Sequence, residues 1–494
     1  STALLRRYAQ SLNIPCACHI PDRMKEGYGP NKDAFASLYT KGCRLVIIVD
    51  CGITAFDPVA DGTAMGLDII IVDHHVAEPR LPDAVAIVNP NRLDDQSSLG
   101  YLAAVGVTFL FLVATNRALR ERGFFTQECK QPDILSLLDL VALGTVCDVV
   151  PLIALNRAFV FQGLKIIAKQ QNPGLQALAS IANIRERLSA HHLGFILGPR
   201  INAGGRVGKA RLGSDILSTD DKQEAQEIAK ILNDYNQERR DLEGQSLQDV
   251  IAIAQDMVKE HHVLCLYSPD WHQGIIGIMA GRIKDMFHRP TLVMTRLDDG
   301  TLKGSGRSVT GVDLGSAIIA AKQQGILING GGHRMAAGFA LAQDKMEILQ
   351  LFMDDYICTV NGGNFPPPSL ILDSVVELAA INEDFMDMLE RVEPCGAQNP
   401  RPRVAVHDVT VRNVRLVGPN LLRCQIFDND GHRLDGILFQ ASTQSLTRNL
   451  LQNDQYSRYH VAGQLQYNLF RQTRKIQLVI HDIKTASYEN NMAI

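Results

Sequence analysis

The stretch that decides the fold is Ile69-Ile70-Ile71-Val72-Asp73-His74-His75, an apolar run that ends in one carboxyl group and two imidazole rings. β-Branched residues without polar alternation are typical of a parallel strand that is covered on both faces. Open α/β sheets bind their ligands at the carboxyl ends of such strands. The run therefore predicts a buried strand that delivers reactive side chains to one edge of a sheet.

Two further apolar stretches carry a carboxyl group in the same way. The run Leu45-Val46-Ile47-Ile48-Val49 leads directly into Asp50, and Asp148 lies inside Gly144-Thr145-Val146-Cys147-Asp148-Val149-Val150-Pro151. Each aspartate alone is more simply explained as a strand-end cap or a turn residue. A buried carboxylate without a partner is costly, however, so several of them beside two histidines favour a shared site. We expect that site to contain Asp50, Asp73, His74, His75 and Asp148.

Carboxylate oxygens and imidazole nitrogens are ligands that suit Mn²⁺, Mg²⁺ or Zn²⁺. Two such ions about 4 Å apart can hold a phosphoryl group while water attacks it. The cysteines do not offer a thiolate site instead, because Cys16-Ala17-Cys18 is their closest spacing and no Cys-x-x-Cys occurs. The sequence predicts metal-assisted phosphoester chemistry rather than a zinc finger.

Several motifs resemble, in the same order, those of the RecJ family of single-strand-specific 5′→3′ DNA exonucleases, within the DHH phosphoesterase superfamily. The first group contains Val49-Asp50-Cys51-Gly52, Asp73-His74-His75 and the Gly144–Pro151 stretch. The more specific group contains Gly194-Phe195-Ile196-Leu197-Gly198-Pro199-Arg200-Ile201-Asn202-Ala203-Gly204-Gly205-Arg206, Trp271-His272-Gln273-Gly274-Ile275-Ile276-Gly277, Lys303-Gly304-Ser305-Gly306-Arg307-Ser308 and Gly330-Gly331-Gly332-His333. The resemblance covers nearly the whole chain.

One motif of the family has no counterpart. An Asp-x-Asp-Gly strand normally precedes a Ser-Thr-Ala-Leu-Leu helix, whereas this chain begins with Ser1-Thr2-Ala3-Leu4-Leu5. On this resemblance the chain is truncated at its first motif and lacks two metal-binding aspartates. Asp22 is expected to be a loop residue and not their replacement, because Pro21 and Gly27 make its surroundings rich in turn formers. We expect the natural protein to be an active nuclease and the chain as given to bind metal poorly and to cut slowly or not at all.

The resemblance implies a role for each acid and histidine. Asp50 would bridge two ions, Mn²⁺ or Mg²⁺, while His74 and Asp148 complete the ligands of one of them. Asp73 would not bind an ion itself but would orient the residues that do. His75 would lie closer to the substrate and assist the developing charge or the leaving oxygen.

The glycine-rich segments are the second candidate part of the site. Close backbone approach, hydroxyl groups and a guanidinium are the ingredients of a phosphate cradle, although runs of glycine are first of all turn formers. With the resemblance, the residues expected to bind nucleic-acid phosphates are Arg200, Asn202, Arg206, Ser305, Arg307, Ser308 and His333. Trp271, the only tryptophan, suits a core anchor as well as a base-stacking surface.

Composition sets wider limits. With 494 residues, 46% hydrophobic and 21% charged, the chain is a globular protein of two to four domains by ordinary domain size. Ten cysteines without an ordered framework favour reduced thiols, and so a cytoplasmic location. No apolar run approaches the roughly 20 residues that span a bilayer.

The fold class we predict is α/β, with a doubly wound DHH domain and a DHH-associated (DHHA1) α/β domain joined by a long helix, followed by a C-terminal OB-like β-barrel. The boundaries are 1–216 for the DHH domain, 217–260 for the connecting helix, 261–360 for the DHHA1 domain, 361–368 for a linker and 369–488 for the OB fold. Helical segments are expected to alternate with buried strands up to about residue 216, and the glycine-rich segments are expected to be loops.

The C-terminal part supplies the basic surface that a net charge of −4 does not. From residue 394 onward it has 12 Lys and Arg and 7 Asp and Glu, and its apolar residues alternate with polar ones as in a small barrel. Arginines interleaved with aromatic residues fit an OB fold that binds single strands by stacking and by phosphate contacts. Those aromatic residues are Tyr456, Tyr459, Tyr467 and Phe470. The alternative is a barrel whose rings are core and whose arginines are a solvated face.

The function expected from the resemblance is hydrolysis of single-stranded DNA to mononucleotides in repair and recombination. Its expected partners are single-stranded DNA, single-strand-binding protein and repair helicases. Two alternatives stay open. One is a phosphodiesterase for short oligonucleotides or cyclic dinucleotides, which would not need a stacking platform. The other is a non-catalytic single-strand-binding scaffold, which would not need the metal-binding set.

Overall fold

The computed structural model describes residues 1–22, 26, 27, 29–362, 365, 369–418, 420–439, 450, 451, 457–470 and 473–486. The chain forms two compact units, Ser1–Pro368 and Ser369–Ile494. Among the described residues, no helix combines the length and the apolar character that a membrane crossing requires.

The first unit begins with a three-stranded parallel sheet, in the order β1 (Leu45–Val49), β2 (Asp68–Val72) and β3 (Ala86–Val88). Its two faces bury different side chains of the same apolar runs. Ile69 and Ile71 pack with Phe35 of α2 (Lys32–Thr40) and Val59 of α3 (Phe56–Ala64) on one face. Ile70 and Val72 face the core formed with α1 (Thr2–Ser11) and α4 (Ala104–Glu121) on the other. Coverage on both faces confirms the doubly wound arrangement.

After β3 the chain is helical as far as Met257, so the expected alternation of helices and strands up to residue 216 is wrong for its second half. The elements that follow α4 are η1 (Ile134–Leu137), α5 (Leu138–Cys147), α6 (Ala154–Ile167), α7 (Pro173–Ile181), η2 (His192–Leu197), α8 (Gly198–Val207) and α9 (Leu212–Ser218). The apolar stretch that leads to Asp148 is the end of helix α5. This helix is apolar on all sides because it is buried among its neighbours, and such a sequence resembles a buried strand.

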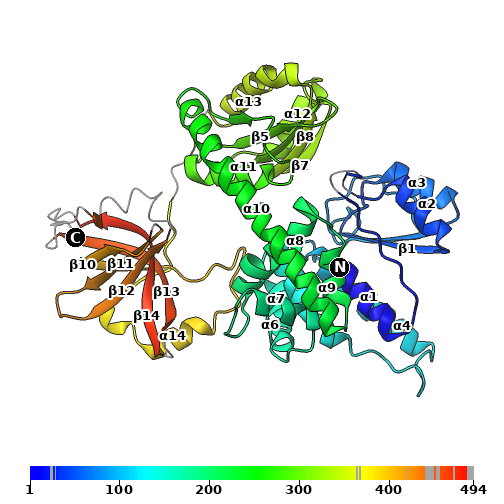
Figure 1. Ribbon diagram of the computed structural model, residues 1–494, viewed down its shortest axis with the longest axis horizontal. Helices are drawn as coiled ribbons and strands as arrows, with labels where there is room; N and C mark the ends of the chain where they lie inside the picture. Colours follow the sequence, from blue (N-terminus) through cyan, green and yellow to red (C-terminus); the bar gives the residue numbers. More distant parts are fainter. Residues whose placement is uncertain are drawn as a thin grey trace. The chain divides into compact units, whose positions relative to one another are not determined.

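The predicted connecting helix is present as α10 (Lys222–Met257), a single helix of 36 residues. Its first turn is capped by Asp221, whose side chain accepts hydrogen bonds from the backbone N–H groups of Gln223 and Glu224. Figure 1 shows α10 running from the α7–α9 helices to the second sheet of this unit. Buried residues such as Ala225 and Leu232 near its start and Val250 and Ala254 near its end anchor it at both places.

The second sheet has the strand order β4-β5-β6-β8-β7, with β4 and β5 parallel and the other neighbours antiparallel. Its strands are β4 (Leu264–Tyr267), β5 (Thr291–Arg296), β6 (Leu302–Arg307), β7 (Asn329–His333) and β8 (Ala336–Leu341). The helices of this part are α11 (Ile276–Phe287), α12 (Leu314–Gln323), η3 (Gln343–Lys345) and α13 (Met346–Asn361).

The glycine-rich segments, expected to be loops, are strands β6 and β7. Glycine is needed there for packing and not for a turn: a Cβ on Gly304 would lie 2.2 Å from the ring of Phe339. Trp271 is 4% exposed and belongs to the core around α11, which favours the core-anchor alternative. Of the predicted linker, residues 363, 364 and 366–368 lie outside the described residues.

The second unit is built on a curled sheet. Its elements are β9 (Ser374–Val375), η4 (Leu378–Ala380), α14 (Glu383–Glu390), β10 (Val404–Leu416), β11 (Leu421–Phe427), β12 (Arg433–Phe439), β13 (Arg458–Phe470) and β14 (Thr473–Thr485). The strand order is β11-β12-β14-β13-β10-β9, and an additional pairing of β11 with β10 closes the sheet into a ring. Alternate residues such as Leu422, Cys424 and Ile426 fill its interior, which confirms the period-two pattern.

Candidate metal centre and phosphate site

The candidate site begins where β1 and β2 end together. The two strands pair in register with Val49 opposite Val72, so Asp50 and Asp73 leave the sheet at the same edge. The chain turns sharply after β1, with positive φ at Asp50 (63°) and at Gly52 (107°). A Cβ on Gly52 would lie 3.0 Å from Ile48, so glycine serves both the turn and the close packing beneath it.

The buried side chain of Asp73 fixes the loops at this edge of the sheet through hydrogen bonds. Its side chain is 0% exposed and accepts hydrogen bonds from the backbone N–H groups of Ile53, His74 and His75, at 3.1, 2.7 and 3.3 Å, and from His75 Nδ1 at 2.7 Å. Burial alone would raise the pKa of Asp73, but these donors outweigh it and lower the pKa below the usual carboxyl value. Asp73 therefore positions both histidines as a buried anion.

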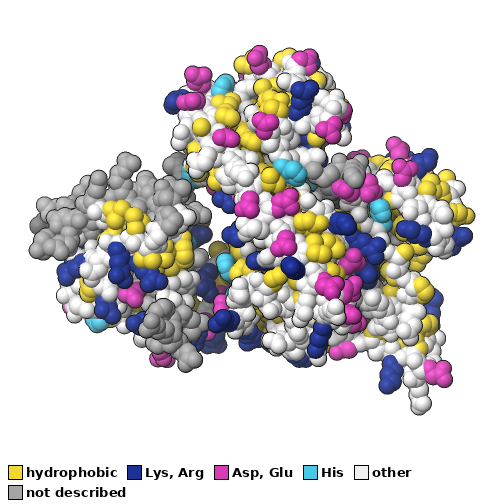
Figure 2. All heavy atoms as spheres, in the orientation of Figure 1, with side chains coloured by type: hydrophobic (Ala, Val, Ile, Leu, Met, Phe, Trp, Pro, Cys, Tyr) yellow, Lys and Arg dark blue, Asp and Glu magenta, His cyan; other side chains and the backbone are white. Residues whose placement is uncertain are grey.

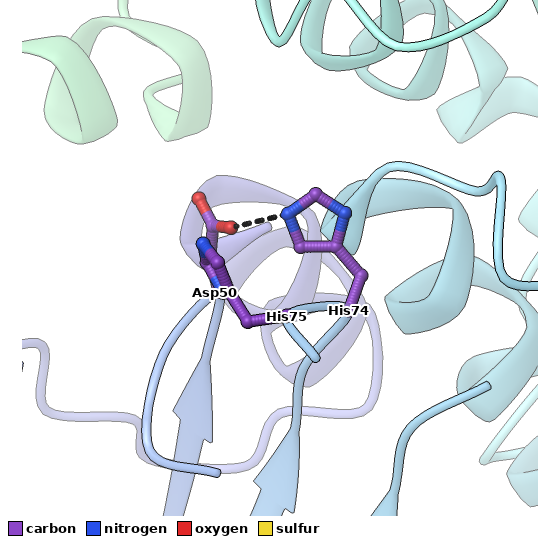
Figure 3. A group of neighbouring side chains, drawn as sticks. All are labelled: Asp50, His74 and His75. Atoms are coloured by element: carbon purple, nitrogen blue, oxygen red, sulfur yellow. Dashed lines mark ion pairs between the residues drawn. The ribbon is translucent and has the colours of Figure 1, made fainter. Parts of the chain in front are cut away.

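His74 lies between two carboxylates. Its Nε2 is 3.4 Å from Asp50 Oδ1 and 3.6 Å from Asp148 Oδ2, while its Nδ1 lies 3.0 Å from the carbonyl oxygen of Leu102, to which it can donate. Burial disfavours the charged ring, yet the hydrogen bond to Asp50 and the charges of both carboxylates raise the pKa of His74 to about 9. Figure 3 shows the His74 ring pointing toward the Asp50 carboxylate.

Asp148, the second carboxylate beside His74, lies at the C-terminal end of helix α5. It is the C-cap residue of α5, and the next residue, Val149, has a positive φ of 60°. A β-branched residue rarely adopts this conformation, so the backbone is strained directly after the carboxylate. Burial, followed by the charge of nearby Asp50, raises the pKa of Asp148 although His74 opposes the change.

The donor set fits a divalent cation. Ligand atoms about 2.1 Å from an octahedral ion lie roughly 3 Å apart, close to the 3.4 and 3.6 Å separations around His74 Nε2. Metal-binding histidines usually donate their other N–H to a carbonyl or a carboxylate, as His74 does to Leu102. Asp50, His74 and His75 also have potential ligand atoms that all lie within 4.8 Å of one another. The geometry thus places His75 beside the predicted ligands Asp50, His74 and Asp148.

Two asparagines that the sequence analysis did not select hold the histidine loop. Asn89 donates to the carbonyl oxygen of His75 at 2.9 Å, and Asn91 donates to that of His74 at 2.6 Å. They follow β3 directly, at the same edge as the two aspartates. The signal that could have identified them is Asn89-Pro90-Asn91 directly after the short apolar run Ala86–Val88.

The second sheet contributes a basic site without an acidic partner. Arg307 on β6 is half-buried and donates to Ser305 Oγ at 3.3 Å, and burial lowers its pKa. Among the described residues no carboxylate forms an ion pair with it. Gly277 of α11 leaves room for both side chains, because a Cβ there would lie 2.9 Å from Ser305 Oγ and 3.2 Å from an Arg307 nitrogen. Arg307 and Ser305 together are therefore suited to bind an anion from solution.

Motifs that are far apart in the sequence come together here. Arg206, at the end of α8, donates to the carbonyl oxygen of Gly274 at 3.1 Å, which links α8 to the segment before α11. The ring of His333 on β7 stacks on His75, with centroids 6.2 Å apart and an interplanar angle of 14°. His333 thus connects the second sheet to the histidine pair.

The other three predicted phosphate ligands are Ser308, Asn202 and Arg200, and their roles stay predictions. Ser308 is 1% exposed and its hydroxyl donates to the carbonyl oxygen of Val312, so it supports its own loop. Asn202 is exposed on α8. Arg200 donates to Asn233 and lines a separate cavity with Arg239.

The outer face of the second unit carries arginines close together. Arg415 on β10 pairs directly with Arg423 on β11, and like charges in such positions repel. Arg412 lies over the ring of Phe427, 5.2 Å from its centroid. Figure 2 shows Lys and Arg side chains gathered on this face, over strands β10–β12. A bound nucleic-acid strand would neutralise the repelling arginines, and one of its bases could stack on the ring of Phe427.

Two of the four predicted aromatic residues of this unit pack against its core. Tyr459 and Tyr467 are partly buried against the core, which favours the core alternative for these two. Tyr456 and the side chain of Phe470 lie outside the described residues.

Comparison with known proteins gives matches over most of the chain. Family models match at residues 1–145 (DHH family, N-terminal domain), 260–358 (DHHA1 domain) and 372–482 (RecJ OB domain). The single-stranded-DNA-specific exonuclease RecJ of Escherichia coli K12 is 34% identical over 474 residues, which covers 94% of this chain and 81% of that relative.

Solved structures of RecJ proteins are also similar to this chain. RecJ from Thermus thermophilus in complex with Mn²⁺ superposes with a TM-score of 0.81 at 26% identity, covering 98% of this chain and 67% of that one. A manganese-bound exonuclease RecJ is 30% identical with a TM-score of 0.60, covering 74% of this chain and 87% of that one. The order of motifs, the three matched domains and these similarities together show that the chain belongs to the RecJ family.

Proposed function

We propose that this protein, with the first motif of its family present, hydrolyses single-stranded DNA to mononucleotides from the 5′ end, with Mn²⁺ or Mg²⁺ as cofactor, in DNA repair and recombination. The observation that carries the proposal is the position of His74 Nε2 between Asp50 and Asp148, 3.4 and 3.6 Å away. The names of the relatives and of the metal-bound structures support the substrate and the cofactor.

Asp50, His74 and Asp148 would hold the ion, and Asp73 with Asn91 keeps the loop in place for them. A bound Mn²⁺ or Mg²⁺ would polarise the phosphodiester and lower the pKa of a water molecule beside it. The carbonyl oxygen of Leu102 fixes the proton on His74 Nδ1, which leaves Nε2 to face the ion.

His75 would act on the substrate side. The hydrogen bond from its Nδ1 to Asp73 raises its pKa, although burial opposes the shift. A protonated ring can donate from Nε2 to a phosphoryl oxygen or to the leaving oxygen. Its stacking on His333 orients it toward the second sheet, where Arg307 and Ser305 would bind a strand phosphate.

Metal binding and catalysis can be tested separately. Replacing Asp50, His74 or Asp148 by alanine should weaken Mn²⁺ binding in calorimetric titrations. His75→Ala should leave Mn²⁺ affinity within about threefold. In the chain preceded by an Asp-x-Asp-Gly strand, it should reduce the turnover of 5′-labelled single strands by roughly 100-fold or more, the usual contribution of a proton donor. Equal loss of Mn²⁺ affinity in all four variants would assign His75 to the metal ligands. Unchanged Mn²⁺ binding in all four would overturn the site.

The arginine face of the second unit favours a polymeric substrate over a cyclic dinucleotide, because a small ligand would not need a binding surface on a separate unit of the chain. Retention of Asp50, His74 and Asp148 in one place argues against a scaffold. A scaffold would bind single strands equally well without Mn²⁺ and would release no mononucleotides, and this result would replace the enzymatic proposal.

We also propose that the chain works with single-strand-binding protein and with repair helicases in the cytoplasm. An enzyme restricted to single strands depends on others to open and to cover its substrate. The cysteines form no disulfide bond among the described residues, which suits a reducing compartment. Co-purification with these proteins from cells, at low and at high salt, would test the partners.

A further inference from the structure

Two segments that are far apart in the sequence form sides of the candidate metal centre. One is residues 100–102, where the carbonyl oxygen of Leu102 lies 3.0 Å from His74 Nδ1. The other is the loop 149–153, which leads from α5 to α6 directly after Asp148. Neither segment is part of a helix or a strand, so side-chain hydrogen bonds and packing must fix the distance between them.

Asn156 joins these two segments. It lies in the first turn of α6 and is 0% exposed. Its side-chain NH₂ group donates to the carbonyl oxygen of Tyr101 at 2.8 Å and to that of Pro151 at 2.9 Å. One amide group thus connects the residue before Leu102 with the loop that follows Asp148.

The loop after Asp148 requires such a support. Val149 at its start and Ala154 just beyond its end have positive φ angles of 60° and 41°, a conformation that residues with a Cβ rarely adopt. Strained backbone of this kind persists only where the surrounding structure holds it. The hydrogen bond to Pro151 lies between the two strained positions. Asn156 therefore acts where the loop would otherwise relax and move Asp148.

Stability alone does not explain an asparagine at this position. Among the described residues, Asn156 Oδ1 is one of the buried side-chain atoms without a hydrogen-bond partner. A buried acceptor in this state is costly. A leucine of similar volume would bury no polar side-chain atom, but it could not donate to two carbonyl groups at once.

We propose that Asn156 is a positioning residue of the metal centre, which keeps His74 and Asp148 at the separation that one divalent cation requires. The inference deepens the proposed function and rests on it for the identity of the ion, Mn²⁺ or Mg²⁺. Through Tyr101, Asn156 fixes Leu102, and the carbonyl oxygen of Leu102 orients the His74 ring. Through its second hydrogen bond it fixes the loop behind Asp148. Because Asn156 is fully buried, it acts on the ion only through these two ligands.

The test compares two variants of Asn156 in the extended chain, which is the chain preceded by an Asp-x-Asp-Gly strand. Asn156→Leu keeps the volume and removes both donors. Asn156→Ser keeps one donor and is the milder change, so it serves if the leucine variant does not fold. Asn116→Ala is the matched control, because Asn116 is a buried asparagine on α4, 3% exposed, whose side chain accepts a hydrogen bond from Tyr8 at 3.3 Å.

Three measurements are made on each protein. Thermal unfolding followed by circular dichroism gives a temperature at which the proteins are folded. At this temperature, calorimetric titration measures the affinity for Mn²⁺, and electron paramagnetic resonance at saturating Mn²⁺ reports how the ligands are arranged around the ion. Turnover of a 5′-labelled single strand is then resolved into kcat and KM.

We expect Asn156→Leu to weaken Mn²⁺ binding by roughly tenfold or more, the usual effect of removing a group that orients a metal ligand. Asn156→Ser should lie between this variant and the wild type. The resonance spectrum of Mn²⁺ bound to Asn156→Leu should differ from that of the wild type, because the ligands are displaced. The kcat should fall while KM for the strand stays within about threefold, since Asn156 does not bind the strand.

The control should lose stability and keep the Mn²⁺ affinity, the spectrum and the kcat of the wild type. Folded Asn156 variants that match Asn116→Ala in Mn²⁺ affinity and in spectrum would overturn the inference. Asn156 would then support only the connection between α5 and α6.

The same proteins separate this inference from the proposed function. Wild-type protein that digests single strands, while Asn156→Leu binds Mn²⁺ like the control, would leave the function standing and remove the positioning role. Wild-type protein that binds Mn²⁺ but releases no mononucleotides, together with weaker Mn²⁺ binding in Asn156→Leu, would do the reverse.

Discussion

Asp73 offers the most detailed test of how the site is built, because a single buried carboxylate accepts four hydrogen bonds. Its Oδ1 accepts from His74 N, His75 N and His75 Nδ1, and its Oδ2 accepts from Ile53 N. In Asp73→Asn the amide oxygen replaces either Oδ1 or Oδ2, and the amide nitrogen replaces the other. The amide NH₂ group then faces another N–H donor in a buried position, where no water can act as the acceptor.

The cost of this change can be estimated. With the amide oxygen at the Oδ1 position, the N–H of Ile53, a residue that is 1% exposed, loses its acceptor, and the new NH₂ group gains none. Each buried donor left without a partner costs about 1–3 kcal/mol, and the bond to His75 loses its ionic character as well. We expect Asp73→Asn to lower the free energy of opening of β1 and β2 by roughly 2–6 kcal/mol and to weaken Mn²⁺ binding by roughly tenfold or more.

Hydrogen exchange resolved by peptide measures the opening of these strands, and calorimetric titration measures Mn²⁺ affinity. Asp68→Asn is the matched control, because Asp68 is exposed at the start of the same strand; this variant should stay within about 0.5 kcal/mol of the wild type. Asp73→Asn with wild-type exchange rates and wild-type Mn²⁺ affinity would refute the positioning role of Asp73.

Two further predictions concern packing and strand binding. A Cβ at Gly163 would lie 2.2 Å from the carbonyl oxygen of Leu138, so Gly163→Ala should destabilise the fold by about 1–3 kcal/mol because it separates α5 and α6. A Cβ at Gly281 on α11 meets nothing within 4 Å, so Gly281→Ala should be neutral or stabilising by up to about 1 kcal/mol. Thermal unfolding followed by circular dichroism compares the two variants, and equal melting temperatures would contradict the packing argument. Arg415→Gln and Arg423→Gln should each reduce the salt slope of single-strand binding by about 0.7, with unchanged turnover of saturating short substrates; a wild-type slope in both variants would mean that this face is only solvated.

The sequence analysis predicted the sheet edge well because parallel strands bring their ends together whatever surrounds them. Apolar β-branched runs before Asp50 and Asp73 were sufficient to predict both strands and the shared edge, and α10 followed from its long helical pattern. The fold class, the RecJ family and the metal-bound relatives agree with those expectations.

Other features could not be read from local patterns. A buried helix such as α5 is apolar on all sides, so its sequence does not distinguish it from a strand, and the position of Asp148 depends on how α5 packs. Gly304 looks like a turn former until the ring of Phe339 is seen against it. Arg200 belongs to a cavity whose other arginines come from α10 and α11, and no sequence motif joins these elements.

The most direct test of the account is Mn²⁺-dependent release of mononucleotides from single strands labelled at the 5′ or at the 3′ end. It should be run on the chain as given and on the chain preceded by the Asp-x-Asp-Gly strand that the family resemblance predicts. We expect the extended chain to release the 5′ label first as a mononucleotide, and His74→Ala in that chain to abolish the release. If neither chain releases mononucleotides while both bind single strands, Asp50, His74 and Asp148 do not form a catalytic metal site and the account is wrong.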